Sequence, residues 1–327
     1  MRILNRLIHA CFVFVVIALS RQSGAVDGLA GGSAVIPAQV PERTTTHKAD
    51  AGLVPRKPWG HPDLEGTWTN FDRTPFERPD QARPPRPANR AEANVGPAPE
   101  WLSQDYSFSR LSPVRPSMVI DPPDGRVPVK PDAEAKRDYD RAHLTDSYEF
   151  SSPWERCITR GVPGGMFPSE YNNALQIIQR RDVVVIHQEM IHENRIIPID
   201  GRPRPPSTVR QWMGVPRGHW EGDTLVIETV GFNDRGWITN NGATGRIKGI
   251  HATADLRVVE RLTRLNANTI QWRATIEDPT VYTRPWTVAM PLNLEPTYQM
   301  FEYACHEGNY AMPNTLSAGR AKDRQKP

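Results

Sequence analysis

The stretch LRVVERLTRLNANTIQWRATIE, Leu256–Glu277, decides the fold class of this chain. Its two strand-length runs, Leu256–Leu265 and Ile270–Glu277, flank the turn sequence Asn266-Ala-Asn-Thr269, and this arrangement predicts a β-hairpin. Strand-length runs and short turns alternate in the same way from Trp154 to His306. The other predicted strands are Leu175–Gln179, Val183–His192, Arg195–Ile199, Val209–Met213, Thr224–Phe232, Trp286–Leu292 and Tyr298–His306.

No helical pattern interrupts this series of predicted strands. Consecutive strands joined by short turns pair antiparallel with their neighbours, as a meander. Closing such a meander into a barrel removes the exposed edge strands. We therefore predict a mainly β fold, an antiparallel up-and-down (lipocalin-like) β-barrel with one or two short helices. A β-sandwich is the alternative.

Proline dominates the part of the chain that precedes the predicted barrel. The sequence holds 32 prolines in 327 residues, about twice the usual share, which disfavours an all-helical bundle. We expect a proline-rich wrap over the barrel, with short elements at Leu64–Thr69 and Ser117–Ile120 and a helix at Asp132–Tyr148. The predicted organisation is a signal peptide at 1–25, a disordered leader at 26–57, the wrap at 58–153, the barrel at 154–316 and a disordered tail at 317–327.

The amino terminus has the pattern of an export signal. Arg2 and Arg6 precede the apolar run Leu7–Leu19, and small residues follow at Ser23-Gly24-Ala25. The alternative is an uncleaved membrane anchor, but a run of this length spans only roughly 20 Å as a helix, against the ~30 Å core of a bilayer. We predict cleavage after Ala25 and a periplasmic or secreted protein.

Charge composition bears on the expected partners. The formal net charge is +3, and removing Arg2, Arg6 and Arg21 with the signal leaves 37 basic residues against 37 acidic ones. A neutral protein has no overall field that attracts nucleic acid or an anionic membrane. We therefore expect a small-molecule substrate or ligand, with no nucleic acid and, after signal cleavage, no membrane as partner.

Two cysteines remain after loss of Cys11 with the signal, Cys157 and Cys305. In an oxidising compartment an even pair at long separation predicts a disulfide. Two buried free thiols are the alternative.

Several short motifs resemble signatures of a family of exported, largely uncharacterised bacterial proteins. They are GHWEGDTLVIET at Gly218–Thr229, YACHEGNY at Tyr303–Tyr310, ERCITRG at Glu155–Gly161 and RQWMG at Arg210–Gly214. The resemblance extends over most of residues 60–315. It implies export and a shared fold, and it supplies no catalytic residues to carry over.

Alternation along the predicted strands selects candidate catalytic groups. His187 and Glu189 share one strand face, Glu302 and His306 share a face of the last predicted strand, and Glu228 alternates with valines. An imidazole and a carboxylate among apolar side chains suit proton transfer if their face lines the barrel interior. For His187, Glu189 and Glu228 the alternative is that the side chains point to solvent, and for the face of Glu302 and His306 it is a role in stability alone.

Candidate substrate-binding residues lie near the two cysteines in sequence or carry hydrogen-bonding and stacking groups. Arg210 and Trp212 share a strand face, which suits a carboxylate or hydroxyl held beside a ring. The full set is Arg156, Tyr171, Asn172, Arg210, Trp212, Asn309 and Tyr310.

Motifs for cofactors are weak. His187 and His192 are five residues apart, whereas helical zinc proteases need histidines four apart with glutamate directly after the first. A site in which His187 and Glu189 are joined by His219, His251 or His306 stays open. The sequence has no glycine-rich phosphate loop after a strand and no Gly-x-Ser-x-Gly elbow. We predict no metal and no cofactor.

These observations favour an exported, cofactor-independent acid/base enzyme. We expect lyase or isomerase chemistry, then hydrolysis, on a small aromatic, terpenoid or sugar-derived substrate in a β-barrel pocket. One alternative is a non-catalytic binding protein for a hydrophobic small molecule. Another is an envelope interaction protein that makes contact through its proline-rich wrap.

Overall fold

The computed structural model describes residues 53–72, 74–79, 115–169 and 171–325. All of them belong to one unit of the chain, Lys48–Pro327. The predicted signal peptide and most of the predicted leader lie outside the described residues. The last leader residues are described, and there Arg56 forms an ion pair with Asp223 at 2.5 Å.

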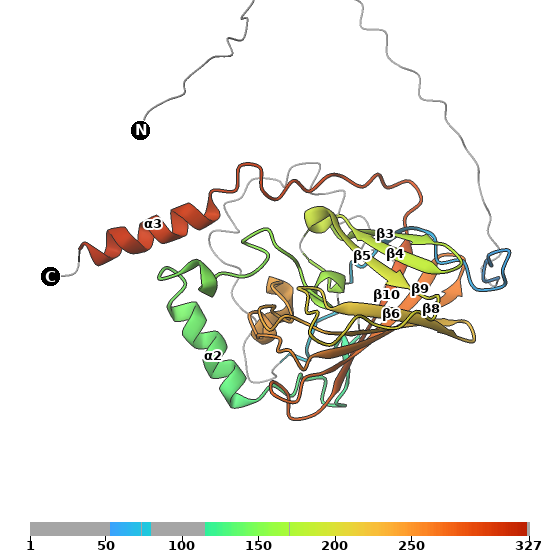
Figure 1. The fold of residues 1–327 in the computed structure, drawn as a ribbon, viewed down its shortest axis with the longest axis horizontal. Coiled ribbons are helices and arrows are strands. Elements are labelled where there is room, and N and C mark those ends of the chain that lie inside the picture. Colours follow the sequence, from blue (N-terminus) through green and yellow to red (C-terminus); the bar gives the residue numbers. More distant parts are fainter. Residues whose placement is uncertain (1–52, 73, 80–114, 170, 326–327) are drawn as a thin grey trace, which may run out of the picture. The chain divides into compact units, whose positions relative to one another are not determined.

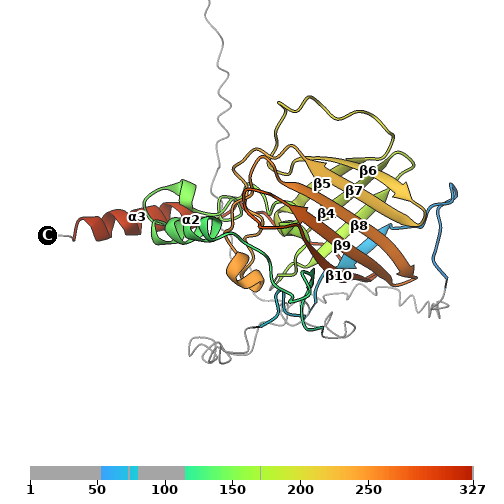
Figure 2. The same cartoon turned by 90° about the horizontal axis from the view of Figure 1, so that it is seen from below.

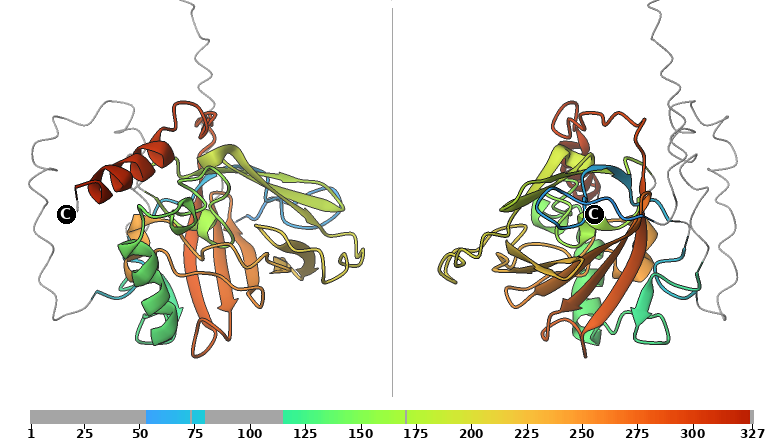
Figure 3. Two further views of the ribbon diagram at one scale, coloured as in Figure 1. Left: turned by 60° about the vertical axis from the view of Figure 1, so that its left-hand side comes forward. Right: turned by 90° about the vertical axis from the view of Figure 1, so that its right-hand side faces the viewer.

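Ten antiparallel strands form one sheet that curves into a nearly closed barrel (Figure 1), which confirms the predicted fold class. Figure 3 shows the sheet curving back on itself, with β3–β5 facing β8–β10. The strands are β1 (Gly66–Thr69), β2 (Val119–Asp121), β3 (Ala174–Gln179), β4 (Val183–Gln188), β5 (Glu193–Pro198), β6 (Val215–Glu221), β7 (Thr224–Val230), β8 (Arg257–Asn266), β9 (Thr269–Glu277) and β10 (Trp286–Leu294).

The proline-rich region contributes strands to the sheet. The strand order is β5-β4-β3-β1-β10-β9-β8-β7-β6, and β2 pairs with β10. Trp68 on β1 lies opposite Leu175 on β3 and Leu294 on β10, so β1 joins the β3–β5 meander to the β6–β10 meander through strands that are far apart in sequence. Part of the segment predicted to lie over the barrel is therefore built into its wall.

A buried ion pair connects the two meanders across the barrel interior. Neighbours along the nine-strand path are antiparallel, so its two end strands, β5 and β6, run in the same direction and share no ladder. Arg195 on β5 donates to Glu260 on β8 through both terminal nitrogens, with Nη1 to Oε1 at 3.0 Å. Trp272 Nε1 also donates to Glu260 Oε1, at 3.0 Å. The pair holds the open side of the sheet against the opposite wall.

Apolar side chains fill the rest of the interior. Strand alternation explains which ones: on β8 every second residue from Val258 to Arg264 is buried, while those between are partly exposed. Fully buried interior side chains include Leu175, Ile177, Val184, Ile186, Ile197, Leu225, Ile227, Val258, Leu262, Ile270, Trp272 and Ile276.

Two predicted strands are absent from the described part of the chain. Residues 209–213 form only an isolated bridge at Gln211, and the next strand, β6, begins at Val215. Gly214 has a φ of +66°, which ends extended structure there. Residues 298–306 are irregular, because Glu189 and the disulfide hold them in place of a neighbouring strand.

Helices lie outside the barrel wall. α2 (Pro131–Ala142) begins with proline, which suits the first helical turn; it starts one residue before the predicted helix and ends six residues before the predicted end. α3 (Ala311–Asp323) occupies residues that we expected to end the barrel and form a disordered tail. The 3₁₀-helices are η2 (Tyr148–Phe150), η3 (Gly164–Met166), η4 (Met190–His192) and η5 (Gly242–Ile247).

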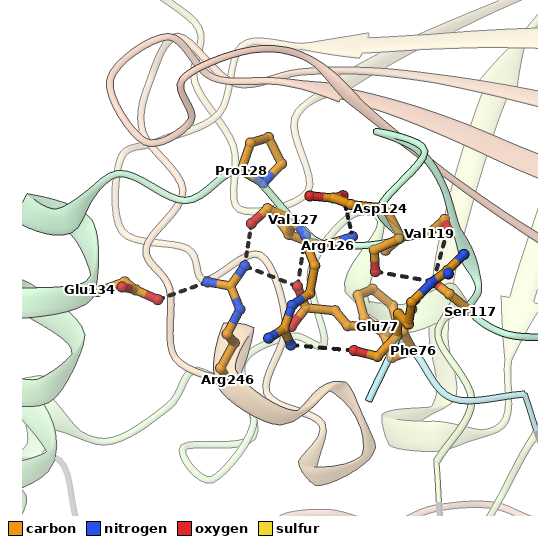
Figure 4. A network of polar contacts seen from close by, with 12 residues as sticks. Phe76, Glu77, Ser117, Val119, Asp124, Arg126, Val127, Pro128, Glu134 and Arg246 are labelled. Atoms are coloured by element: carbon orange, nitrogen blue, oxygen red, sulfur yellow. Dashed lines mark hydrogen bonds and ion pairs between the residues drawn. The ribbon is translucent and has the colours of Figure 1, made fainter. Parts of the chain in front are cut away.

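Arg246 of η5 ties α2 to the proline-rich segment (Figure 4). Its Nη1 donates to Glu134 of α2 at 2.8 Å, and its Nη2 donates to Glu77 at 3.0 Å and to the Val127 carbonyl. Arg137 of α2 donates in return to the Arg246 carbonyl. These contacts fix α2 beside the barrel end at which β6, β8 and β10 begin (Figure 2).

Cys157 and Cys305 form a disulfide with a Cα–Cα distance of 5.6 Å, as predicted. It links the segment before β3 to the irregular segment before α3. Of the helices in the described ranges, none combines the length and the apolar character needed to cross a bilayer.

Candidate functional site at the barrel end

A cavity of about 810 Å³ opens at the barrel end beside α2. Its walls come from α2, from η2 and the segment after it, and from the connections that precede β6, β8 and β10. The residues that line it include Asp132, Lys136, Asp140, Tyr148, Glu149, Phe150, Arg156, Trp212, Asp234, Arg235, Trp237, His251, Thr253 and Thr280.

A histidine–aspartate pair lines this cavity. His251 Nε2 lies 2.5 Å from Asp140 Oδ2, and the two side chains are 22% and 4% exposed. Asp140 reaches the cavity because Ala133, Arg137 and Asp140 share the inward face of α2, at positions i, i+4 and i+7. The pair therefore joins a helix to a connection 111 residues further along the chain.

Backbone pairing positions the imidazole. Trp237 and His251 face each other in a short antiparallel bridge between two parts of the β7–β8 connection. Ile238 N donates to the Ile250 carbonyl and Ala252 N to the Gly236 carbonyl, both at 2.9 Å. The His251 and Trp237 rings lie 5.5 Å apart between centroids. The ring is thus held by a rigid support.

Burial lowers the pKa of His251 below its ordinary value, and the positive charge of Lys136 lowers it further. The hydrogen bond to Asp140 opposes both effects. Lys136 Nζ lies 3.7 Å from Asp140 Oδ2, one helical turn away. The imidazole is therefore neutral at neutral pH. Because a carboxylate only accepts, Nε2 carries the proton and Nδ1 is the acceptor. No described residue hydrogen bonds to Nδ1.

Asp278 stabilises the wall next to His251. It accepts from Thr253 N at 2.9 Å, from Thr253 Oγ1 at 3.0 Å and from Thr280 N at 3.2 Å. Burial raises the pKa of its carboxyl group. These bonds join the end of the connection that precedes β8 to the start of the connection that precedes β10, and both segments line the cavity.

Arg156 brings a cation to the opposite part of the cavity wall. Its guanidinium carbon lies 5.1 Å from the centre of the Tyr148 ring and 6.0 Å from that of Trp212. Arg156 N donates to the Ser152 carbonyl at 3.2 Å, and the next residue is the disulfide cysteine Cys157. Turn, disulfide and two aromatic faces together fix the position of this guanidinium.

Residues close to Arg156 in the sequence line two smaller cavities. One of about 430 Å³ is lined by Thr159, Glu193, Arg210 and Trp212, among others. Burial raises the pKa of Glu193, which accepts from Thr159 Oγ1 and from Arg160 N. The other, about 280 Å³, lies at the disulfide and is lined by Trp154, Glu155, Tyr171, Tyr303, Cys305, Asn309 and Ala311.

The five predicted catalytic residues are not brought together. His187 lies on the outer face of β4, and its Nδ1 bonds to Asn194 Oδ1 at 2.9 Å. Glu189 does not share that face, because β4 ends at Gln188 and η4 begins directly after. The Glu189 carboxylate is buried, and it accepts from Tyr298 Oη at 2.9 and 3.0 Å and from Phe301 N at 2.9 Å.

The other three also lie away from any shared site. Glu228 is on the outer face of β7, between Arg204 and Arg257 at 2.7 Å each. Glu302 and His306 are exposed in the irregular segment before α3. The prediction that Glu302 and His306 share a strand face is wrong, because residues 298–306 form no strand.

The predicted substrate-binding residues divide among three places. Arg156 and Trp212 line the large cavity, Arg210 and Trp212 the second, and Tyr171 and Asn309 the third. Asn172 has a φ of +51° in the turn before β3, and Tyr310 is 69% exposed at the start of α3. Asn309 Nδ2 donates to the Glu155 carbonyl at 3.1 Å, so it braces the segment that carries Arg156.

Asp140 is the site residue that the sequence analysis did not select, and His251 entered only as an optional third metal ligand. One signal was present: a charged residue on the same helical face as Ala133 and Arg137 implies a buried partner. Within the described ranges, no three His, Cys, Asp or Glu side chains are grouped so as to hold a metal ion.

Comparison of the chain with protein-family models, with curated proteins and with solved structures finds no match.

Proposed function

We propose that this protein is a cofactor-independent acid/base enzyme whose reaction takes place in the cavity at the barrel end. His251 is the base and Asp140 the residue that orients it. The observation that carries the proposal is the His251–Asp140 hydrogen bond inside a cavity large enough for a substrate.

A neutral imidazole that lines a cavity, and whose Nδ1 has no hydrogen-bond partner among the described residues, suits proton abstraction. When Nδ1 takes a proton from a substrate carbon or hydroxyl, the imidazolium gains an attractive interaction with the Asp140 carboxylate. The electron pair left on the substrate moves toward an adjacent carbonyl or a leaving group. Return of the proton to a different atom completes an isomerisation, and its delivery to the leaving group completes an elimination. Activation of a water for hydrolysis is the next candidate.

The dimensions and walls of the cavity support a small organic substrate. Small-molecule sites typically enclose about 300–1,000 Å³, and this cavity encloses about 810 Å³. Phe150, Trp212 and Trp237 line it, which suits stacking against a ring. A small aromatic, terpenoid or sugar-derived substrate remains the proposed class, bound beside the barrel end and not inside the barrel.

Export to the periplasm or the medium is part of the proposal. It rests on the amino-terminal signal pattern, and the Cys157–Cys305 disulfide favours an oxidising compartment. A binding protein for a hydrophobic small molecule is the second candidate, because the same three aromatic rings would serve a ligand that is not converted.

Turnover by matched variants tests the enzyme proposal. A panel of lignin-derived, terpenoid and oligosaccharide compounds is incubated with the wild type, His251→Gln and Asp140→Asn. Glutamine keeps an N–H donor toward Asp140 but accepts no proton, so we expect kcat to fall by about 10²- to 10⁴-fold. His187→Gln is the control and should leave kcat unchanged. Binding without conversion by the wild type would favour the second candidate, and equal turnover by wild type and His251→Gln would exclude His251 as the base.

A further inference from the structure

We infer that Arg156 is the carboxylate-binding residue of this cavity, and that its substrate or ligand is a monoanionic organic acid with an apolar or aromatic body. The inference rests on the proposed function for its location, because it assigns a ligand class to the same cavity. It concerns binding, so it is tested without turnover.

Within the described ranges, the guanidinium of Arg156 has no anionic partner. No carboxylate or carbonyl oxygen of the described residues bonds to it, although its side chain is half-buried. By contrast, Arg246 and Arg257 are also partly buried, and each bonds two carboxylates. A fixed guanidinium without a counter-ion, facing a cavity, presents a planar fork of donors that matches a carboxylate.

The aromatic neighbours prepare this guanidinium for an anion. The Tyr148 ring, and Trp212 at the longer distance, contact it as cation–π partners. They restrict its rotamers without using up its in-plane N–H donors. Less side-chain entropy is then lost when a ligand binds. Arg235 also lines the cavity but is exposed and lacks ring contacts.

The charge of the cavity favours a carboxylate over a phosphate. Its cations are Lys136, Arg156 and Arg235, and its carboxylates are Asp132, Asp140, Glu149 and Asp234. With His251 neutral, the wall carries one negative charge in excess. A dianionic phosphate would meet more repulsion there than a carboxylate, and a carboxylate needs only the one planar partner.

The rest of the ligand would face apolar surface. Trp212 contacts the guanidinium and lines the same cavity as Phe150 and Trp237. An acid held at Arg156 therefore extends its body along aromatic walls in the space that His251 also faces.

Calorimetric titration with matched acid and amide pairs tests the inference. The probes are benzoate, cinnamate, 4-hydroxycinnamate and cyclohexanecarboxylate, each with its primary amide, and phenyl phosphate. The proteins are the disulfide-bonded wild type, Arg156→Gln, Arg156→Lys and Arg235→Gln, which removes the same charge from the same cavity. Thermal unfolding followed by circular dichroism checks that each variant is folded.

We expect the wild type to bind at least one acid about tenfold or more tightly than its amide. Arg156→Gln should lower the affinity for that acid by about 10- to 100-fold and change the affinity for the amide by less than about threefold. Arg156→Lys should recover only part of the affinity, because it keeps the charge without the fork. Arg235→Gln should stay within about threefold of the wild type.

Three results would overturn the inference. The first is that the wild type binds no acid more tightly than its amide, and the second is that Arg156→Gln and Arg235→Gln lose acid affinity equally. The third is that the wild type binds phenyl phosphate more tightly than every carboxylate. The wild-type comparison of acid with amide stands even if a variant does not fold. Absence of turnover by the wild type contradicts the proposed enzyme but not this inference, so the two failures are distinguishable.

Discussion

The Arg195–Glu260 pair in the barrel interior and the His251–Asp140 pair at the barrel end both join a carboxylate to a nitrogen donor, but they serve different purposes. In the barrel interior, Glu260 accepts from both terminal nitrogens of Arg195 and from Trp272. The side chains of Glu260 and Arg195 are 0% and 3% exposed. At the barrel end, Asp140 accepts from His251 Nε2, and the imidazole lines a cavity with no described residue bonded to its Nδ1. The first pair has its bonding capacity used within the protein, so it holds structure. In the second pair, no described residue bonds to His251 Nδ1, so this atom stays available for a substrate.

The difference shows that burial alone does not identify a site. Glu189 is also fully buried, and its two oxygens accept from Tyr298 and Phe301, so it anchors the segment before α3. A candidate site needs burial on one side and an unused donor or acceptor facing open volume on the other. His251 and Arg156 meet both conditions in the same cavity.

Breaking the interior pair should produce the largest change in stability. Arg195→Met leaves Glu260 buried without its counter-ion, and we expect the free energy of unfolding to fall by about 3–5 kcal/mol. Urea denaturation at neutral pH measures it. The double variant Arg195→Met/Glu260→Leu should recover much of the loss, because no unpaired charge remains. A single variant as stable as the wild type would show that the pair does not hold β5 against the opposite wall.

Removing the disulfide should have the next largest effect. Cys157→Ser/Cys305→Ser should lower the free energy of unfolding by about 2–4 kcal/mol, because the reduced chain gains conformational entropy when unfolded. Acid binding should weaken as well, since Arg156 is adjacent to Cys157. Acid affinity unchanged in the folded variant would mean that the rings alone position Arg156.

The fold was largely predictable from the sequence, whereas the site was not. The runs that became β3, β7, β8, β9 and β10 carry their own turn signals, so local pattern located them to within about two residues. The local sequence of Gly66–Thr69 does not indicate that this strand pairs with both β3 and β10. The end of β4 at Gln188, which separates His187 from Glu189, depends on the reversal at η4, where Ile191 has a φ of +62°. Asp140 and His251 meet only through tertiary packing, which the sequence pattern does not encode directly.

The pH dependence of stability sharpens the contrast between the two pairs. The pKa of His251 is lower in the folded protein than its ordinary value of about 6.5. The unfolded state therefore binds more protons as the pH falls below about 6.5, and stability is lost toward the folded pKa. Urea denaturation of wild type and His251→Gln between pH 7.5 and about 5 should show a steeper decline for the wild type. Parallel curves would mean that His251 titrates alike in both states.

The outer-face residues should give the smallest effects. Glu228→Gln removes contacts with Arg204 and Arg257 at the surface, and we expect a loss of about 0–1 kcal/mol in unfolding free energy. Activity and acid binding should not change. If Glu228→Gln lost much of its activity but kept its stability, the outer face of the barrel would again be a candidate site.

The most direct test of the account is the protonation state of His251, measured by ¹H–¹⁵N correlation spectra of protein labelled in its histidine rings. Comparison with His251→Gln assigns the resonance. We predict a neutral ring with the proton on Nε2 at pH 7 and a midpoint of titration below 6.5. A ring protonated on Nδ1, or a midpoint above 6.5, would contradict the assignment of His251 as a base facing the cavity.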